Sequence, residues 1–233
     1  MAARFLREHP SGWFTPKPEI VVSVKGANPQ PDSLFTVLPD QSVVFDAKTA
    51  FESAKLKLPL TAGRVAMIRL ELIPRDQHGG SILRSSEETT TISLRPALVR
   101  KESGAEARLP IYFGEADHKE DRYANGFDVI GVRDAWRTSK PQRTSRQTAV
   151  WVLDRSIEVR DGDTLVCDLG KASVGCVRLS VSPFANADPL AKNLGEELAA
   201  ALAKPAGERT ENERVLLGGT FLLSLNADVS AIA

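Results

Sequence analysis

The chain has 233 residues, of which 42% are hydrophobic and 26% are charged, a composition typical of an ordinary folded protein. Thirty Lys and Arg residues balance thirty Asp and Glu residues, so the formal net charge is zero. A zero balance supplies no overall field for nucleic acid or for an anionic membrane surface, and we expect neither partner. The sequence has no apolar run of the roughly 18 residues that a membrane-spanning helix needs. Residues 1–10 also lack the apolar region of a secretory signal peptide.

The first residues predict the end of a helix. Residues 2–9 (AARFLREH) favour a helical conformation, and Pro10 stops it because proline cannot continue the helical hydrogen bonds. A chain that begins inside such an element suggests an excerpt from a longer protein. We assign residues 1–16 to an N-terminal helix end and linker.

Residues 17–183 predict an all-β domain. Short β-branched runs alternate with turn residues, and no helical pattern of useful length interrupts them, which is typical of an antiparallel β-sandwich. The even-numbered residues from Ala66 to Leu72 are apolar, whereas Arg69 and Glu71 lie between them, so one strand face is expected in the core. The predicted strands are Ile20–Val24, Leu34–Leu38, Val43–Phe45, Val65–Ile73, Thr89–Leu94, Leu109–Phe113, Thr148–Leu153, Ser156–Val159, Thr164–Cys167 and Val174–Val181.

Residues 184–233 predict a helical connector. Leucines recur at helical spacing over Asp188–Lys204, and Pro205 ends the pattern. Thr210 and Glu213 have the spacing of a capping box, in which each side chain bonds the other residue's backbone N–H. A second helix is therefore predicted over Glu211–Leu225.

The two cysteines, Cys167 and Cys176, leave two interpretations open. If residues 168–175 form the turn of a hairpin, the two side chains lie opposite each other, within reach of a disulfide bond. The alternative is a pair of buried thiols. Oxidation would require an exported protein, because disulfides persist in oxidising compartments.

An acidic segment offers candidate metal ligands. Calcium prefers six to eight oxygen ligands, and carboxylates with loop carbonyls supply them. The candidates are Glu115, Asp117, Asp121 and Asp128. Cations interleave with these residues, so a solvated loop with local ion pairs is the alternative, and a bound Ca²⁺ would have a structural role.

Aromatic and cationic residues in the same region are candidates for ligand binding. A sugar ring presents a C–H face that stacks on an aromatic ring, and its hydroxyl edge bonds polar side chains. The candidates are Trp136, Arg133, Arg137, Tyr123 and Asn125. Trp136 has an alternative role as a plug that closes the end of the sandwich. The basic run from Arg133 to Arg146 suits an anionic polysaccharide or a phosphate, or it is a solvated loop.

Catalytic signatures are missing from the sequence. It contains no G-x-S-x-G, no H-E-x-x-H and no phosphate-binding Walker loop. We therefore expect a protein that is not an enzyme, with no cofactor in this chain beyond a possible structural Ca²⁺.

Several passages carry a family resemblance in their order along the chain. They are PSGW at 10–13, LPDQSVVF at 38–45, IRLELIP at 68–74, FGEADHKEDRYANGFDVIGVRDAW at 113–136, TAVWVLD at 148–154, GDTLVCDLG at 162–170 and VRLSVSP at 177–183. Together they resemble the planctomycete cytochrome-c-associated multidomain proteins of the PSCyt/PSD families. Residues 201–217 look like the connector into the last large domain of such proteins.

The resemblance implies a fold, a role and a location. The fold would be a galactose-binding-like jelly roll, and the chain would be a carbohydrate-binding module in a periplasmic or extracellular protein. Haem would lie elsewhere in the parent protein, and the partners would be a polysaccharide or glycan together with the sister domains. The alternative role is a structural spacer or docking module that binds no small ligand.

Overall fold

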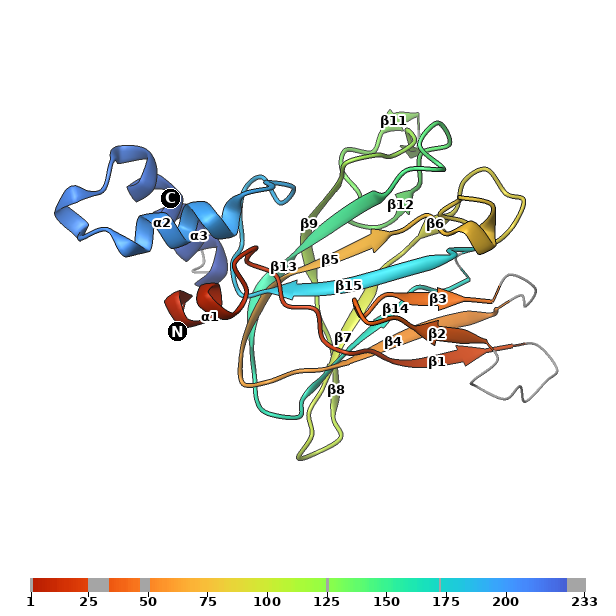
Figure 1. The fold of residues 1–233 in the computed structure, drawn as a ribbon, viewed down its shortest axis with the longest axis horizontal. Helices are drawn as coiled ribbons and strands as arrows, with labels where there is room; N and C mark the ends of the chain where they lie inside the picture. Colours follow the sequence, from red (N-terminus) through yellow and green to blue (C-terminus); the bar gives the residue numbers. More distant parts are fainter. Residues whose placement is uncertain (1, 25–33, 47–50, 125, 172, 226–233) are drawn as a thin grey trace.

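The structure is a computed structural model that describes residues 2–24, 34–46, 51–124, 126–171 and 173–225. Within these ranges strands predominate, and a group of helices lies at one end (Figure 1). The strand pairings of the two larger sheets are all antiparallel. The prediction of a mostly antiparallel β protein is confirmed.

Two sheets form the body of the molecule. The five-stranded sheet has the order β1 (Glu19–Ser23), β4 (Ser53–Pro59), β14 (Thr164–Asp168), β7 (Arg95–Val99) and β8 (Glu106–Arg108). The six-stranded sheet has the order β2 (Phe35–Val37), β3 (Val43–Phe45), β15 (Cys176–Ser182), β5 (Gly63–Leu72), β13 (Gln147–Val159) and β9 (Ile111–Ala116). Two small pairs join β10 (Tyr123–Ala124) to β11 (Phe127–Asp128) and β12 (Trp136–Arg137) to β6 (Thr91–Ile92).

One hydrophobic core lies between the two large sheets, so the body is a β-sandwich. Leu56 and Leu58 of β4 share a buried cluster with Ile68 and Leu70 of β5. All four side chains are fully buried, and burying a leucine side chain contributes about 1.5–3 kcal/mol to stability. Strand alternation produces this arrangement because every second residue points to the same face.

The sequence pattern missed part of the sheet and divided another part. The strands β4, β7 and β8 were not predicted, although β4 alternates lysine and leucine at residues 55–58. The predicted strands at 148–153 and 156–159 are one long strand, β13, with a bulge between Val152 and Ile157. Opposite this bulge, the alternation of inward and outward side chains in β5 is interrupted. Val65 lies in the sandwich core, whereas Ala66 lies in a second cluster outside it.

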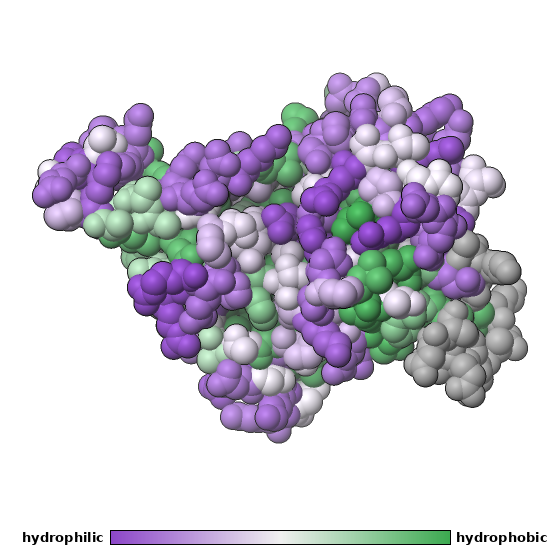
Figure 2. Space-filling model, viewed as in Figure 1, coloured by the Kyte–Doolittle hydropathy of each residue, from purple (hydrophilic) through white to green (hydrophobic). Residues whose placement is uncertain are grey.

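Three helices pack on the outer face of the six-stranded sheet, and their side chains form the second hydrophobic cluster together with those of the sheet. They are α1 (Ala2–Glu8), α2 (Leu194–Ala203) and α3 (Glu211–Leu225), and short 3₁₀ turns cover Asp76–His78 (η2) and Ala206–Glu208 (η3). Leu6 of α1 and Leu198 of α2 pack with Met67 and Val152 of the sheet. Figure 2 shows hydrophobic surface where the helices adjoin the sandwich. Among the described residues, no helix combines the length and apolarity needed to cross a membrane.

The predicted bounds of the helices hold best where a cap defines them. The N–H of Thr210 donates to Glu213 Oε2 at 2.8 Å, and the N–H of Glu213 donates to Thr210 Oγ1 at 3.3 Å. This reciprocal pair is the predicted capping box, and α3 spans Glu211–Leu225 as expected. By contrast, α2 begins at Leu194, six residues later than the leucine pattern suggested.

The two cysteines are free and buried, so the disulfide is excluded. Cys167 lies on β14, which pairs with β4 and β7, whereas Cys176 lies on β15, which pairs with β3 and β5. The expected hairpin is wrong because the chain crosses from one sheet to the other between the two residues. Burial raises the pKa of the Cys167 thiol to about 12, so this side chain is an unreactive part of the core.

A buried aspartate, Asp163, fixes the turn between β13 and β14, which contains Asp161 and Gly162. Gly162 has a φ of 87°, which favours glycine. The Asp163 carboxylate accepts hydrogen bonds from the N–H of Arg160 at 2.9 Å, the N–H of Lys101 at 3.1 Å and Arg100 Nη1 at 2.7 Å. Together these contacts lower the pKa of Asp163 to about 2.

We expect Asp163→Asn to lower the midpoint of thermal unfolding at pH 7 and to remove part of its pH dependence. The folded pKa lies below the ordinary value of 3.8, so the carboxylate stabilises the fold above about pH 4 and this contribution is lost as pH falls toward 2. Unfolding midpoints measured between pH 2 and pH 7 test this. Asp154→Asn, at an exposed position of β13, is the control. Equal pH profiles for wild type and Asp163→Asn would contradict the assignment.

Candidate functional site

Two buried tryptophans anchor the long connection between β9 and β13. The Trp151 indole N–H donates to the carbonyl of Val132 at 3.0 Å, and the Trp136 indole N–H donates to the carbonyl of His118 at 2.9 Å. The rings pack edge to face with centroids 6.3 Å apart. Trp151, from the sheet, and Trp136, from the connection itself, therefore hold the connection against the end of the sandwich.

The burial of Trp136 corrects the expectation that it stacks on a ligand. Its exposed fraction is 0%, so neither ring face is available to a sugar. The side chain instead fills the end of the core. The alternative role of Trp136 as a plug agrees with this position.

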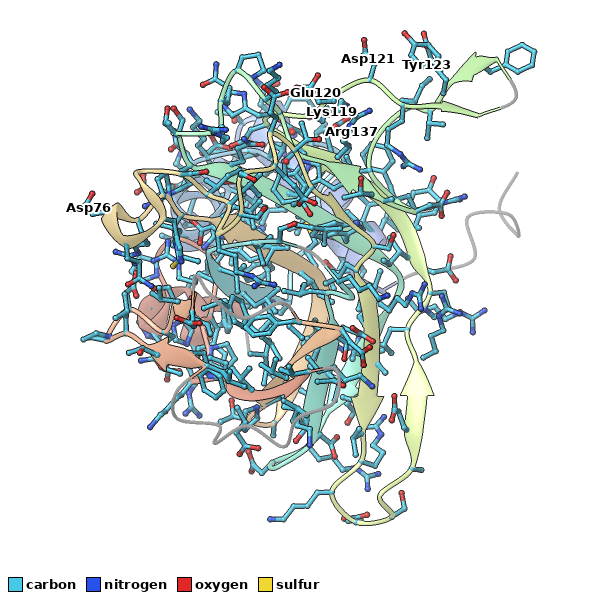
Figure 3. The ribbon with its side chains drawn as sticks, turned by 90° about the vertical axis from the view of Figure 1, so that its right-hand side faces the viewer. Asp76, Lys119, Glu120, Asp121, Tyr123 and Arg137 are labelled. Carbon is cyan, nitrogen blue, oxygen red and sulfur yellow. The ribbon has the colours of Figure 1, made fainter. Side chains whose placement is uncertain are left out.

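A polar cleft of about 610 Å³ lies beside this closed end. Three segments that are distant in the sequence form its walls: the residues leading into β6, the approach to β10 together with β12, and the connection from β14 to β15. The lining residues are Glu87, Thr89, Thr90, Thr91, Asp121, Arg122, Tyr123, Arg137, Lys171 and Ser173. In Figure 3, Asp121 and Tyr123 lie along the segment that projects toward the β10–β11 hairpin, and Arg137 lies nearer the body.

Hydrogen bonds to the backbone join the walls of the cleft. Thr90 Oγ1 accepts from the N–H of Ser173 at 3.1 Å, and the N–H of Thr90 donates to Thr138 Oγ1 at 2.9 Å. On the other wall, Arg122 Nη1 donates to the carbonyl of Ala135 at 2.6 Å. These bonds connect all three segments, so the cleft is part of the folded scaffold.

The side chains in the cleft combine one aromatic ring with mixed charges. Tyr123 is 68% exposed, and its ring is available for stacking. Arg122, Arg137 and Lys171 supply three cations, and Glu87 and Asp121 supply two carboxylates. Ser173 and Glu87 are joined by a hydrogen bond between their side chains. Such a set offers donors and acceptors for several hydroxyl groups of a neutral or weakly charged ligand.

The structure brings together only part of the predicted binding set. Tyr123 and Arg137 line the cleft. Arg133 does not line it; this side chain pairs with Asp134 at 3.2 Å, and their hydrogen bond raises the pKa of Arg133. Asn125 lies outside the described residues. The sequence reasoning missed the three threonines at 89–91, of which the first two directly precede β6 and the third begins it.

The predicted calcium ligands do not converge. Among the described residues, no three His, Cys, Asp or Glu side chains are grouped as a metal site. Glu115 pairs with Lys119, and Asp117 Oδ1 accepts from the N–H of Thr148 at 2.7 Å. Asp121 lines the cleft, whereas Asp128 lies exposed on β11. The calcium expectation is corrected because these carboxylates bond local cations and backbone, or point to solvent.

A second hollow of about 570 Å³ surrounds the β13–β14 turn. Its charged residues largely pair with one another: Arg100 contacts Asp163 at 2.7 Å and Arg160 contacts Glu102 at 3.1 Å. The described lining includes no aromatic ring. The first cleft is therefore the stronger candidate for a ligand.

Comparisons with known proteins find low similarity. No family model and no curated protein matches the sequence. Among solved structures, SpGH29 has 11% identity and a TM-score of 0.29 over 72% of this chain and 27% of that chain. CpGH89CBM32-4, produced by Clostridium perfringens, has 8% identity and a TM-score of 0.29 over 72% of this chain and 96% of that chain. The catalytic domain of a GH87 α-1,3-glucanase has 12% identity and a TM-score of 0.27, covering 76% of this chain and 31% of that domain. This chain thus corresponds to under a third of SpGH29 and of the glucanase domain.

Proposed function

We propose that the chain is a non-catalytic carbohydrate-binding module with a galactose-binding-like jelly-roll sandwich. The observation that carries the proposal is the exposed ring of Tyr123 on the wall of the polar cleft. A sugar needs an apolar face beside fixed hydrogen-bonding groups, and the cleft offers both. Its walls belong to the folded scaffold, which reduces the ordering cost of binding.

The proposed binding mode follows from the chemistry of the lining. The C–H face of a sugar ring would lie on Tyr123, and its hydroxyl groups would bond Arg137 and Asp121. Hydrogen bonds that involve a charged partner are stronger than those between neutral groups. The threonine hydroxyl groups at the start of β6 would accept or donate hydrogen bonds at the opposite edge of the sugar ring.

The family resemblance supports a cellular context for this proposal. We place the module in a larger exported cytochrome-c-associated protein, in the periplasm or outside the cell. There it would hold a glycan close to the sister domains. The passages quoted from residues 10–183 are the support for this placement.

We expect Tyr123→Ala to weaken glycan binding about tenfold, because the stacking surface is lost; a tenfold change corresponds to about 1.4 kcal/mol. A glycan array with the wild-type chain identifies the sugar, and titration calorimetry measures its affinity. Arg137→Ala is expected to weaken the same binding through lost hydrogen bonds.

Tyr112→Ala is the matched control for this prediction. Tyr112 is 64% exposed on β9 and does not line the cleft, so its removal should leave the affinity unchanged. The proposal fails if the array shows no bound glycan, or if both tyrosine variants bind as the wild type does.

A docking module is the second candidate, and one feature of α3 favours it. Val215, Phe221 and Leu222 are 64%, 62% and 49% exposed, although neighbouring leucines of the same helix pack on the sandwich. Exposed apolar clusters often mark contact surfaces. A sister domain in the same polypeptide is the proposed partner of this surface.

We expect Phe221→Glu in the parent polypeptide to speed proteolytic separation of this module from its sister domain severalfold, because a charge would not be buried in an apolar contact. Limited proteolysis followed by mass spectrometry measures the rate. Tyr112→Glu is the control for an added charge at an exposed aromatic position. Unchanged cleavage in the Phe221 variant would argue against docking through α3.

A further inference from the structure

Charged side chains gather on the outer face of the six-stranded sheet, beyond the part that the helices cover. Glu71 of β5 lies opposite Arg178 of β15 in the strand register, and Arg69 lies opposite Ser180. Arg146 directly precedes β13 on the other side of β5. Strand alternation places these residues away from the core, whose face carries Leu70 and Leu72.

Glu71 is the centre of this group. Arg178 donates to both of its carboxylate oxygens, from Nε at 2.7 Å and from Nη2 at 2.9 Å. Arg69 and Arg146 also approach the carboxylate, at 3.7 Å and 3.4 Å. The hydrogen bonds from Arg178, with the two further guanidinium charges, lower the pKa of Glu71 against the opposing effect of burial. The carboxylate is therefore ionised and shared by three arginines.

A fourth arginine extends the group past Arg178. Arg178 Nη1 contacts Asp40 at 3.3 Å. Arg75 donates from Nη2 to Ser42 Oγ at 3.0 Å and from Nε to Cys176 Sγ at 3.4 Å. Asp76, the next residue, forms no ion pair with this group in the described structure.

The group carries more positive than negative charge. Four guanidinium groups, from Arg69, Arg75, Arg146 and Arg178, face two carboxylates, from Asp40 and Glu71. Arg146 is 56% exposed and uses one nitrogen for Glu71, so most of its donors face solvent.

Arg69 adds a positive charge that the surrounding structure holds in place. Its guanidinium lies 4.5 Å from the ring centroid of Trp13, and Nη2 donates to Ser180 Oγ at 3.4 Å. Its Nε is buried and has no hydrogen-bond partner. Burial, together with repulsion from Arg178 and Arg146, lowers the pKa of Arg69. Arg178 and Arg146 thus repel the Arg69 guanidinium, and the attraction of Glu71 opposes this repulsion.

We propose that these four arginines form a binding site for a tetrahedral oxyanion, a sulfate or phosphate group, separate from the polar cleft. Guanidinium groups bind such anions through paired N–H donors. An anion beside Arg146, Arg178 and Arg75 would neutralise the surplus charge and relieve the repulsion among the cations. The group shares no residue with the lining of the cleft, so this site does not depend on sugar binding at Tyr123.

The test uses anions that differ in source but share this chemistry. Sodium sulfate and sodium phosphate are compared with sodium chloride at equal ionic strength, and dextran sulfate is compared with neutral dextran. Thermal shift and titration calorimetry measure binding, because an anion that binds only the folded state raises the unfolding midpoint. A response to the free ions identifies a small-anion site, whereas a response to dextran sulfate alone identifies a sulfated polymer; both outcomes support the site.

Variants separate the site from general charge effects. Arg146→Gln and Arg75→Gln are each expected to weaken the binding at least about tenfold, as expected when charge-assisted hydrogen bonds are lost. Arg155→Gln removes the same charge from an exposed position of β13 outside the group and should bind as the wild type does. Tyr123→Ala should also bind normally.

Circular dichroism and the midpoint without anion confirm that each variant is folded. The proposal is overturned if neither sulfate, phosphate nor dextran sulfate has an effect beyond chloride. It is also overturned if Arg155→Gln weakens binding as much as Arg146→Gln does, because that result shows a diffuse charge effect and no defined site.

Discussion

The position of the long connection between β9 and β13 depends on the contact between Trp151 and Trp136. Each indole bonds a backbone carbonyl of that connection while its ring stays in the core. On the neighbouring strand β9, Gly114 lies opposite Trp151, and a Cβ at this glycine would lie 2.7 Å from Trp151 Cδ1, so the glycine leaves room for the ring. The same packing sets the place of β12, and β12 carries Arg137 into the cleft. The position of Arg137 on the wall of the cleft is thus a direct result of core packing at the end of the sandwich.

The two proposed sites use charge in different ways. In the cleft, cations and carboxylates are interspersed around an exposed ring, which suits a ligand with many hydroxyl groups. On the outer face of the sheet, arginines surround Glu71 and outnumber the acidic partners, which suits an anion. Replacing Glu71 alone would leave three guanidinium groups without their shared partner, so this carboxylate also matters for stability.

Features that depend on residues close together in the sequence were predicted correctly in the examples below. Features that depend on which distant strands pair were not. The capping box at Thr210 and Glu213 depends on residues three apart, and it gave the bounds of α3 correctly. Strand alternation likewise placed Ile68 and Leu70 in the core. The separation of Cys167 from Cys176 depends on which strands pair, and a turn pattern does not contain that information. The cleft shows the same limit: Tyr123 and Arg137 were identified, but Lys171 and the threonines of residues 89–91 approach them only after both sheets have formed.

The helical layer has a consequence for the order of folding. It joins α1, from the first residues, to α2, from the last fifth of the sequence, and a Cβ on Gly195 would overlap the backbone at Pro10 and Gly12. Met67 and Val152 therefore stay uncovered until the ribosome has made α2. During synthesis the nascent sheet therefore has an exposed hydrophobic strip. Contacts between residues so far apart in the sequence form slowly. This strip is where a chaperone would bind before the two ends of the chain meet.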